Sequence, residues 1–422
     1  MKSFKSIKTA KTLMSPYLGL PKPIYIIFLS RVINAMGMFI FPLFTLILNK
    51  KIGLSPSETG YWLMIMSLVF VPSSIIGGKI ADHMGRKKPI IIFQTIGALL
   101  YIVCGFMPAG TEQVYVVLAA CFFFGLAEPA QSAIMADLTT PENREGAYSL
   151  SYMGFNLGFA IGPVLGGILF QYDLYNWLFW GDAATLLVST LLIALLVPET
   201  FGTHIEAVSE DRVLEHAVEG STWSVLKSRP ILIWFSLILL SYNFAYAQWG
   251  YLLPLHTVQN FKDGALFYGL LASANGVIVI LFTPLVTKWL EGRRDLDKNV
   301  LGGILYMVGF GAFGFVSGKW MFLLCCFIFT IGEIVVTISF MPFLANRTPA
   351  SHRGRINAIL PLIMGTGRAI GPLIMGHVIE ASSIEMGWKL VGLVMLGGVI
   401  LMKGLDFLDN RMVEDVEGES EA

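Results

Sequence analysis

Long apolar runs separated by short polar breaks follow one another along the whole chain. Twelve of these runs reach about 20 residues, the length that a helix needs to cross a bilayer. Backbone N–H and C=O groups find no water partners in lipid, so each run is predicted to form a membrane-spanning α-helix. The predicted spans are 24–48, 59–81, 89–108, 114–137, 145–170, 174–197, 231–256, 265–288, 299–317, 320–344, 355–379 and 388–408.

The longest polar segment, residues 198–230, lies between the sixth and the seventh span. It divides the chain into 1–197 and 231–422, and it is too short to fold as a domain of its own. The two parts share a repeat, because GFAIGPVLGG from Gly158 matches GRAIGPLIMG from Gly367, 209 positions later. The pattern predicts an all-α membrane protein of two pseudo-symmetric six-helix bundles joined by a cytoplasmic linker.

The composition agrees with a chain embedded in lipid. Hydrophobic residues make up 55% of the sequence and charged residues 14%, against about 25% charged residues in soluble proteins. The net charge is zero, so nothing indicates a nucleic-acid partner. The four cysteines show neither metal-ligand nor disulfide spacing, and the G-x-G-x-x-G pattern at Gly309 lies inside a span. We therefore expect no metal, no cofactor and no enzymatic activity.

The distribution of lysine and arginine predicts the orientation, because cytoplasmic loops carry the excess of positive charge. With both termini in the cytoplasm, the cytoplasmic segments carry 22 of these residues and the external segments five. The remaining two, Arg31 and Arg368, lie within spans. We expect a multi-pass protein of the inner or plasma membrane with both termini cytoplasmic.

The loop between the second and third spans carries a dense motif, GGKIADHMGRKKP from Gly77 to Pro89. It resembles the signature loop of the major facilitator superfamily, G-x-(L/I)-A-D-R-x-G-R-(K/R), with His83 where arginine is usual. The resemblance implies two six-helix bundles around a central cavity, and a loop that latches them through Asp82. The alternative is that the positive charges of residues 86–88 only fix the orientation of the protein in the membrane. The motif residues are Gly78, Asp82, Gly85, Arg86 and Lys87.

The fifth span carries a glycine ladder with a helix-distorting proline. Its glycines recur at every fourth position, which places them on one helix face where a neighbouring backbone can approach closely. The segment resembles the antiporter motif of the 12-span drug:H+ antiporters, G-x-x-x-G-P-x-x-G-G. An ordinary packing face is the alternative. The residues are Gly154, Gly158, Gly162, Pro163, Gly166 and Gly167.

Charged residues inside spans are the main candidates for function, because each costs about 2.5–3.5 kcal/mol near the bilayer centre. Arg31 and Glu128 lie at similar depths, and so do Glu333 and Arg368, so we expect each pair to face each other. Asp182 is a weaker candidate. A structural ion pair or a side chain that reaches toward the interface is the alternative for each.

The superfamily's architecture implies that spans 1, 4, 7 and 10 line the central cavity. Polar residues near the charged ones are then expected to contact substrate. They are Asn34, Gln131, Asn243, Tyr246, Gln248 and Thr337.

These features predict a secondary active transporter, a proton-coupled exporter of small organic or amphipathic compounds that works by alternating access. Many drug exporters of the superfamily carry an acid in the first span, where this chain has Arg31. Uptake or efflux of an anionic metabolite, such as a sugar acid or a carboxylate, is therefore the alternative. The expected partners are a small-molecule substrate, protons and the lipid bilayer, and the protein is expected to act as a monomer.

Overall fold

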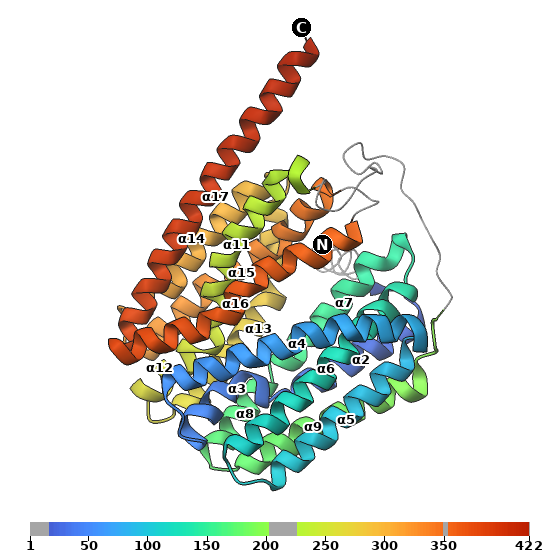
Figure 1. The fold of residues 1–422 in the computed structure, drawn as a ribbon, viewed down its shortest axis with the longest axis vertical. Coiled ribbons are helices and arrows are strands. Elements are labelled where there is room, and N and C mark those ends of the chain that lie inside the picture. Colours follow the sequence, from blue (N-terminus) through green and yellow to red (C-terminus); the bar gives the residue numbers. More distant parts are fainter. Residues whose placement is uncertain (1–16, 202–225, 349–352, 422) are drawn as a thin grey trace, which may run out of the picture. The chain divides into compact units, whose positions relative to one another are not determined.

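The computed structural model describes residues 17–201, 226–348 and 353–421 (Figure 1). In these ranges the regular structure is helical throughout, and eleven helical segments are long and apolar enough to cross a membrane. The expected ninth span corresponds to helix α14, Asp295–Ala312, whose first turn carries Asp295 and Asp297. Because of these charges, α14 is not one of the eleven segments. The prediction of an all-α membrane protein is confirmed.

The chain forms two compact units. The first contains the described residues of Met1–Phe44, Met66–Val208 and Ala265–Gly276, and the second those of Thr45–Ile65, Ser209–Gly264 and Val277–Ala422. The division therefore runs through helices α3 (Ile40–Leu46), α4 (Pro56–Met84) and α13 (Gly264–Trp289), and not only through the polar segment. Most of the expected linker, 202–225, lies outside the described residues.

The helices follow the expected spans in order. Those of the first part of the chain are α2 (Lys22–Met36), α3 (Ile40–Leu46), the π-helix Ile47–Lys51, α4 (Pro56–Met84), α5 (Lys87–Phe106), α6 (Thr111–Asp137), α7 (Pro141–Phe159), α8 (Gly162–Gln171) and α9 (Tyr175–Leu196). Those of the second part are α11 (Pro230–Gly250), α12 (Leu252–Asn260), α13 (Gly264–Trp289), α14, α15 (Lys319–Arg347), α16 (Arg353–Ala381) and α17 (Ile384–Glu421).

Three spans are broken helices. The first is interrupted between α2 and α3, where Gly37 packs so closely on α9 that an added Cβ would lie 1.6 Å from the Oγ1 atom of Thr185. The fifth is interrupted between α7 and α8 beside Pro163, which has no N–H to continue the helical hydrogen bonds. The seventh is interrupted at Tyr251, between α11 and α12. These breaks expose backbone groups that need other partners.

Candidate functional site

A cavity of about 410 Å³ lies within the second unit. Its volume is within the range of about 300–1,000 Å³ that is usual for small-molecule sites. Four helices line it, and Tyr306 is the contribution of α14. The other lining residues are Leu239, Tyr242, Asn243 and Tyr246 on α11, Glu333, Val336, Thr337 and Phe340 on α15, and Pro361, Met364, Gly365 and Arg368 on α16.

The lining residues on α11, α15 and α16 share one spacing. On each helix they occupy positions i, i+3, i+4 and i+7, starting from Leu239, Glu333 and Pro361. Residues at this spacing lie on a single face of an α-helix. Three such faces turned toward one another form the cavity wall, so the site could be recognised from sequence once the contacts between helices are known.

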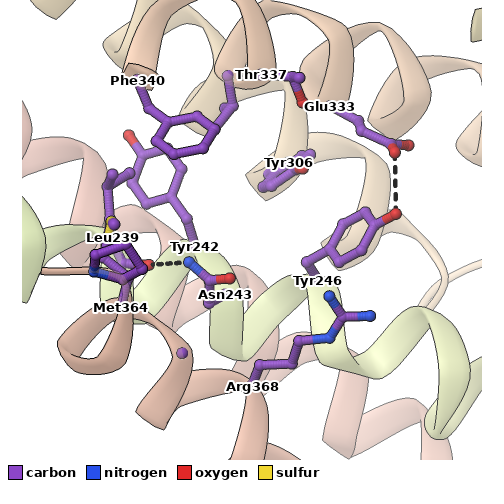
Figure 2. A pocket seen from close by; sticks show the side chains of 13 residues that line it. Leu239, Tyr242, Asn243, Tyr246, Tyr306, Glu333, Thr337, Phe340, Met364 and Arg368 are labelled. Atoms are coloured by element: carbon purple, nitrogen blue, oxygen red, sulfur yellow. Dashed lines mark hydrogen bonds between the residues drawn. The ribbon is translucent and has the colours of Figure 1, made fainter. Parts of the chain in front are cut away.

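Tyr246 lies between the two charged residues of the cavity (Figure 2). Its hydroxyl donates a hydrogen bond of 2.9 Å to the Oε1 atom of Glu333. The guanidinium carbon of Arg368 lies 5.6 Å from the centre of the Tyr246 ring. The ring of Tyr306 stacks on the ring of Tyr246, with 6.2 Å between their centroids. One phenol thus contacts both the acid and the base.

The expected direct pair between Glu333 and Arg368 is not present among the residues that the structure describes. The two residues line the same cavity, as predicted, but Glu333 bonds to Tyr246 and Arg368 stacks on the ring of Tyr246. The two charged residues therefore lie at one site without contacting each other. Figure 2 shows the Tyr246 ring between them.

The remaining predicted cavity residues of this part divide into two groups. Asn243 and Thr337 line the cavity, and Asn243 also donates to the carbonyl of Leu239 through its Nδ2 atom. Gln248 is fully buried outside the cavity and donates to the carbonyl of Phe244. The side chain of Gln248 faces Gly371, where an added Cβ would lie 2.9 Å from its Nε2 atom. Gln248 therefore packs α11 against α16 and does not face the cavity.

A second, narrow cavity of about 20 Å³ lies in the first unit. It brings together three predicted residues, Arg31, Asn34 and Gln131, beside a hydrogen-bonded pair of hydroxyls from Ser30 and Ser189. A volume of this size has room for about one water molecule. In this structure the cavity is too small for a substrate.

Two predicted acids of the first unit have other partners. The carboxylate of Glu128 accepts a hydrogen bond of 3.3 Å from the hydroxyl of Ser132, and no ion pair with Arg31 is found in the described ranges. The buried carboxylate of Asp182 accepts a hydrogen bond of 3.2 Å from the backbone N–H of Ile40. Asp182 therefore supplies an acceptor at the break of the first span, where the helical partner of Ile40 is missing.

The motif loop after α4 turns at Gly85, whose φ of +88° favours glycine over residues with a side chain. Arg86 then reaches three acceptors. Its side chain bonds to the carbonyl of Ala81 at 2.7 Å, to Asp82 at 3.1 Å and to Asp137 at 3.3 Å. The Asp137 side chain is only 1% exposed. Arg86 thereby ties the end of α4 to the end of α6.

Glu199, which follows α9, completes this cluster. Its carboxylate accepts hydrogen bonds from the backbone N–H groups of Arg86 and Lys87, at 2.8 and 3.0 Å. Lys87 begins α5, so the carboxylate caps the N-terminus of that helix, where negative charge is stabilising. Sequence analysis predicted the loop motif but did not predict that Glu199 is its partner.

The predicted latch residue Asp82 is 73% exposed and pairs within the loop with Arg86. Gly78 has only the ring of Pro129 near it, since an added Cβ would lie 3.9 Å from the Cβ atom of Pro129. The role of Asp82 as a latch remains a prediction.

The second part of the chain has a counterpart of this motif loop, the segment from Lys288 to Arg294. Gly292, between α13 and α14, also has a positive φ of +76°. Arg294 follows it and pairs with Asp406 at 2.9 Å and with Asp409 at 3.0 Å, both on α17. Arg347, at the end of α15, also pairs with Asp409 at 2.9 Å. The acids that pair with Arg294 are thus supplied by the last helix.

The glycine ladder of the fifth span packs against α2. An added Cβ on Gly158 would lie 2.3 Å from the carbonyl oxygen of Val32, and one on Gly162 would lie 2.6 Å from that of Ala35. Elsewhere along the first span, Gly154 faces Phe28 on α2, and Gly166 faces the side chain of Leu43 on α3. The predicted close packing of the ladder is present in the structure.

The last glycine of the motif faces a different helix. An added Cβ on Gly167 would lie 2.8 Å from the carbonyl oxygen of Ala265 at the start of α13. Reciprocally, an added Cβ on Gly269 of α13 would lie 2.3 Å from the carbonyl oxygen of Pro163. The motif therefore serves two helix contacts, one with α2 and one with α13.

Apolar spans around a ligand-sized cavity that carries an acid and a base define a membrane transporter. The family model described as Major Facilitator Superfamily matches residues 27–335, more than half of the chain. The chain belongs to this superfamily. It is therefore an integral membrane protein of a transporter family, and the predicted resemblance to the drug:H+ antiporters is confirmed by its relatives.

Three relatives cover nearly the whole chain. An uncharacterized MFS-type transporter, YttB, of Bacillus subtilis is 28% identical over 87% of this chain and 90% of its own length. A Na(+), Li(+), K(+)/H(+) antiporter of Planococcus maritimus is 23% identical over 91% and 95%. The multidrug resistance protein MdtH of Yersinia pestis is 25% identical over 92% and 94%.

Solved structures agree on the fold. A crystal structure of a POT family transporter in complex with a thioalcohol-conjugated peptide matches with a TM-score of 0.77 at 14% identity, over 94% of this chain and 97% of that one. The human organic anion transporter MFSD10 matches with a TM-score of 0.64 at 16% identity, over 90% and 100%.

Proposed function

We propose that the protein is a secondary active transporter that exports small organic, amphipathic compounds in exchange for protons. The observation that carries this proposal is the position of Glu333 in the wall of a ligand-sized cavity, within hydrogen-bond distance of a tyrosine. A carboxylate in such a place can hold a proton in one state of the transport cycle and release it in the other. The protein would act as a monomer in the plasma membrane, with both termini cytoplasmic.

The physical basis of coupling is the changing environment of that carboxylate. Burial disfavours the ionised form, while water and hydrogen-bond donors such as the Tyr246 hydroxyl favour it. Alternating access would expose Glu333 to each side of the membrane in turn. A proton bound from one side would then leave on the other, in exchange for substrate.

Three further observations support export by exchange. The glycine and proline motif of the fifth span is filled at every position and packs against two helices. One relative is named a cation/H+ antiporter and another a multidrug resistance protein. These names describe the relatives, and they make proton exchange the mechanism to test first for this chain.

The test is a proton-flux screen in proteoliposomes that contain an entrapped pH-sensitive dye. We expect some amphipathic compounds to drive proton movement through the wild-type protein and none to do so through Glu333→Gln. The matched control is Glu291→Gln, which neutralises an exposed acid after α13. Compound-driven proton movement through Glu333→Gln at the wild-type rate would contradict the assignment of Glu333.

A second function, proton-coupled transport of an anionic metabolite such as a sugar acid or a carboxylate, is favoured by the arginines. Arg31 and Arg368 both lie within spans and line cavities. Counterflow of a labelled sugar acid in the same proteoliposomes separates the two functions. Rapid exchange of a sugar acid, without exchange of amphipathic compounds, would favour the second.

A further inference from the structure

We propose that the cavity of the second unit binds amphipathic compounds that carry a single acidic group, with this group on the guanidinium of Arg368. The aromatic wall of the cavity would contact the apolar part of the compound. This inference rests on the proposed function and names its substrate class.

The first step in the argument is the state of Arg368. It lies in the middle of α16 and carries a planar guanidinium with five N–H donors and no acceptor. Within the described part of the chain its contact is the Tyr246 ring, and it has no carboxylate partner. A cation over an aromatic ring gains less free energy than a cation near the bilayer centre costs. The Arg368 residue is exposed in the structure, so its guanidinium is open to a further partner.

The second step is the position of the nearest acid of the cavity. Glu333 accepts the hydrogen bond of Tyr246 and does not neutralise Arg368 (Figure 2). The planar guanidinium can therefore present its N–H donors to an acidic group of a ligand. Guanidinium and carboxylate groups match in a two-point hydrogen-bonded geometry that an ammonium group cannot offer. An anionic ligand would supply the partner that α15 does not.

The third step concerns the other lining residues, which determine what kind of molecule can carry the acidic group. Most of the other lining side chains are aromatic or aliphatic, including Tyr242, Tyr306, Phe340 and Met364. Besides the tyrosines, the neutral polar side chains there are Asn243 and Thr337. The hydroxyls of Tyr242 and Tyr246 already donate to the carbonyl of Asn299 and to Glu333, and the Nδ2 atom of Asn243 donates to a backbone carbonyl. A polyhydroxylated acid would leave several hydroxyl groups without partners, which is costly. An aromatic or aliphatic acid fits this wall better than a sugar acid.

The experiment uses three probes with one skeleton and different charges. They are 4-phenylbutyrate, 4-phenylbutyramide and 4-phenylbutylamine, added to the purified protein in lipid nanodiscs without any gradient. The readout is the Tm of the protein. We expect the carboxylate to raise the Tm by about 2–4 °C at saturation. We expect the amide and the amine to leave the Tm within the error of the measurement.

Three variants assign the effect to the guanidinium. Arg368→Gln should lose the shift caused by the carboxylate, and Arg368→Lys, which keeps the charge without the two-point geometry, should retain a smaller one. The matched control is Arg293→Gln, because Arg293 is also stacked on an aromatic ring, 5.0 Å from the centre of Trp289, but lies outside the cavity. Arg293→Gln should keep the full shift.

Three results would overturn the inference. They are a larger Tm shift with the amine than with the carboxylate, a carboxylate shift that survives in Arg368→Gln, and no shift of the wild-type protein with the carboxylate. Arg368→Lys keeps the test informative if Arg368→Gln does not fold. Because no gradient is used, such a result leaves proton coupling through Glu333 standing. Conversely, proton movement through Glu333→Gln at the wild-type rate would contradict the assignment of Glu333 and would leave the binding result unchanged.

Discussion

The backbone N–H of Arg86 donates a hydrogen bond of 2.8 Å to the carboxylate of Glu199, a residue 113 positions later in the chain. This contact joins the loop before α5 to the segment that follows α9. Burial acts to raise the pKa of Glu199, but the backbone N–H groups of Arg86, Lys87, Phe201 and Thr200 outweigh it and hold the pKa below its ordinary value of 4.5. The contact therefore stabilises the folded protein through the ionised carboxylate.

The first prediction concerns the pH dependence of that stabilisation. A lowered pKa in the folded state means that the contribution is fully present above pH 4.5 and is lost as the pH falls through the lowered pKa. Glu199→Gln should lower stability near neutral pH by about 1 kcal/mol, as for loss of a helix cap. Thermal unfolding of both proteins in detergent between pH 3 and pH 8 would measure it. A difference that stays constant over the whole range would contradict an electrostatic cap.

The second prediction concerns the glycine ladder. Gly158→Ala should weaken packing, because the new Cβ would lie 2.3 Å from a backbone carbonyl of α2, and backbone atoms cannot move aside as a side chain can. We expect a loss of about 1–3 kcal/mol, with lower expression and transport. The control is Gly397→Ala on α17, where no atom lies within 4 Å of the added Cβ. Equal effects of the two substitutions would show that the close approach is unimportant.

The third prediction concerns Arg294 and its acids. Arg294→Gln would leave Asp406, whose side chain is 2% exposed, with Lys403 as its remaining partner. We expect a loss of about 1.5–3 kcal/mol, as for a hydrogen bond to a charged group. Adding Asp406→Asn should restore part of the stability, measured by thermal unfolding of the single and double variants. Fully additive effects would argue against energetic coupling between the two residues.

The fourth prediction concerns Glu333 and Arg368. Because Tyr246 contacts both residues, the effects of Glu333→Gln and Arg368→Gln on stability should be coupled, and the double variant should differ from the sum of the single variants by about 0.5–3 kcal/mol. Chemical unfolding of the four proteins provides the measurement. A double variant more stable than either single one would indicate a direct ion pair in the dominant state. Proton-driven transport should be absent whenever Glu333 is replaced.

The fifth prediction concerns topology. In a background without cysteine, single cysteines in place of Lys51, Lys262 or Lys319 should react with a membrane-impermeant thiol reagent added outside intact cells. Cysteines in place of Lys88 or Arg294 should react only after the membrane is opened. The physical reason is the excess of lysine and arginine in the segments assigned to the cytoplasm. External labelling at Lys88 would reverse the assignment.

The sequence predicted the helices and the residue types of the site better than their partners. Hydrophobic run length placed the spans, and the spacing of Gly154 to Gly166 identified a packing face that the structure shows against α2. Depth along a span placed Glu333 and Arg368 in one cavity. It could not predict that Tyr246 separates them, because the rotation of α11 against α15 depends on packing along the whole length of both helices.

Other features depend on contacts between residues far apart in the chain. Gln248 has the polarity of a cavity residue, but the small size of Gly371 on α16 leaves room for it between two helices. Asp406 and Asp409 pair with Arg294 of the loop before α14, although they lie more than 100 positions later. A motif search along the chain does not connect residues at such distances.

The bond between Asp182 and Ile40 places a constraint on biosynthesis. Spans enter the membrane in the order in which they leave the ribosome, so the first span is present long before residue 182 is made. Until then the N–H of Ile40 at the break lacks the carboxylate that it bonds to in the finished protein. An unpaired backbone donor is costly in lipid, so the early first span is better accommodated as an unbroken helix. The break would then form only when the sixth span arrives, which makes the broken helix a product of late assembly.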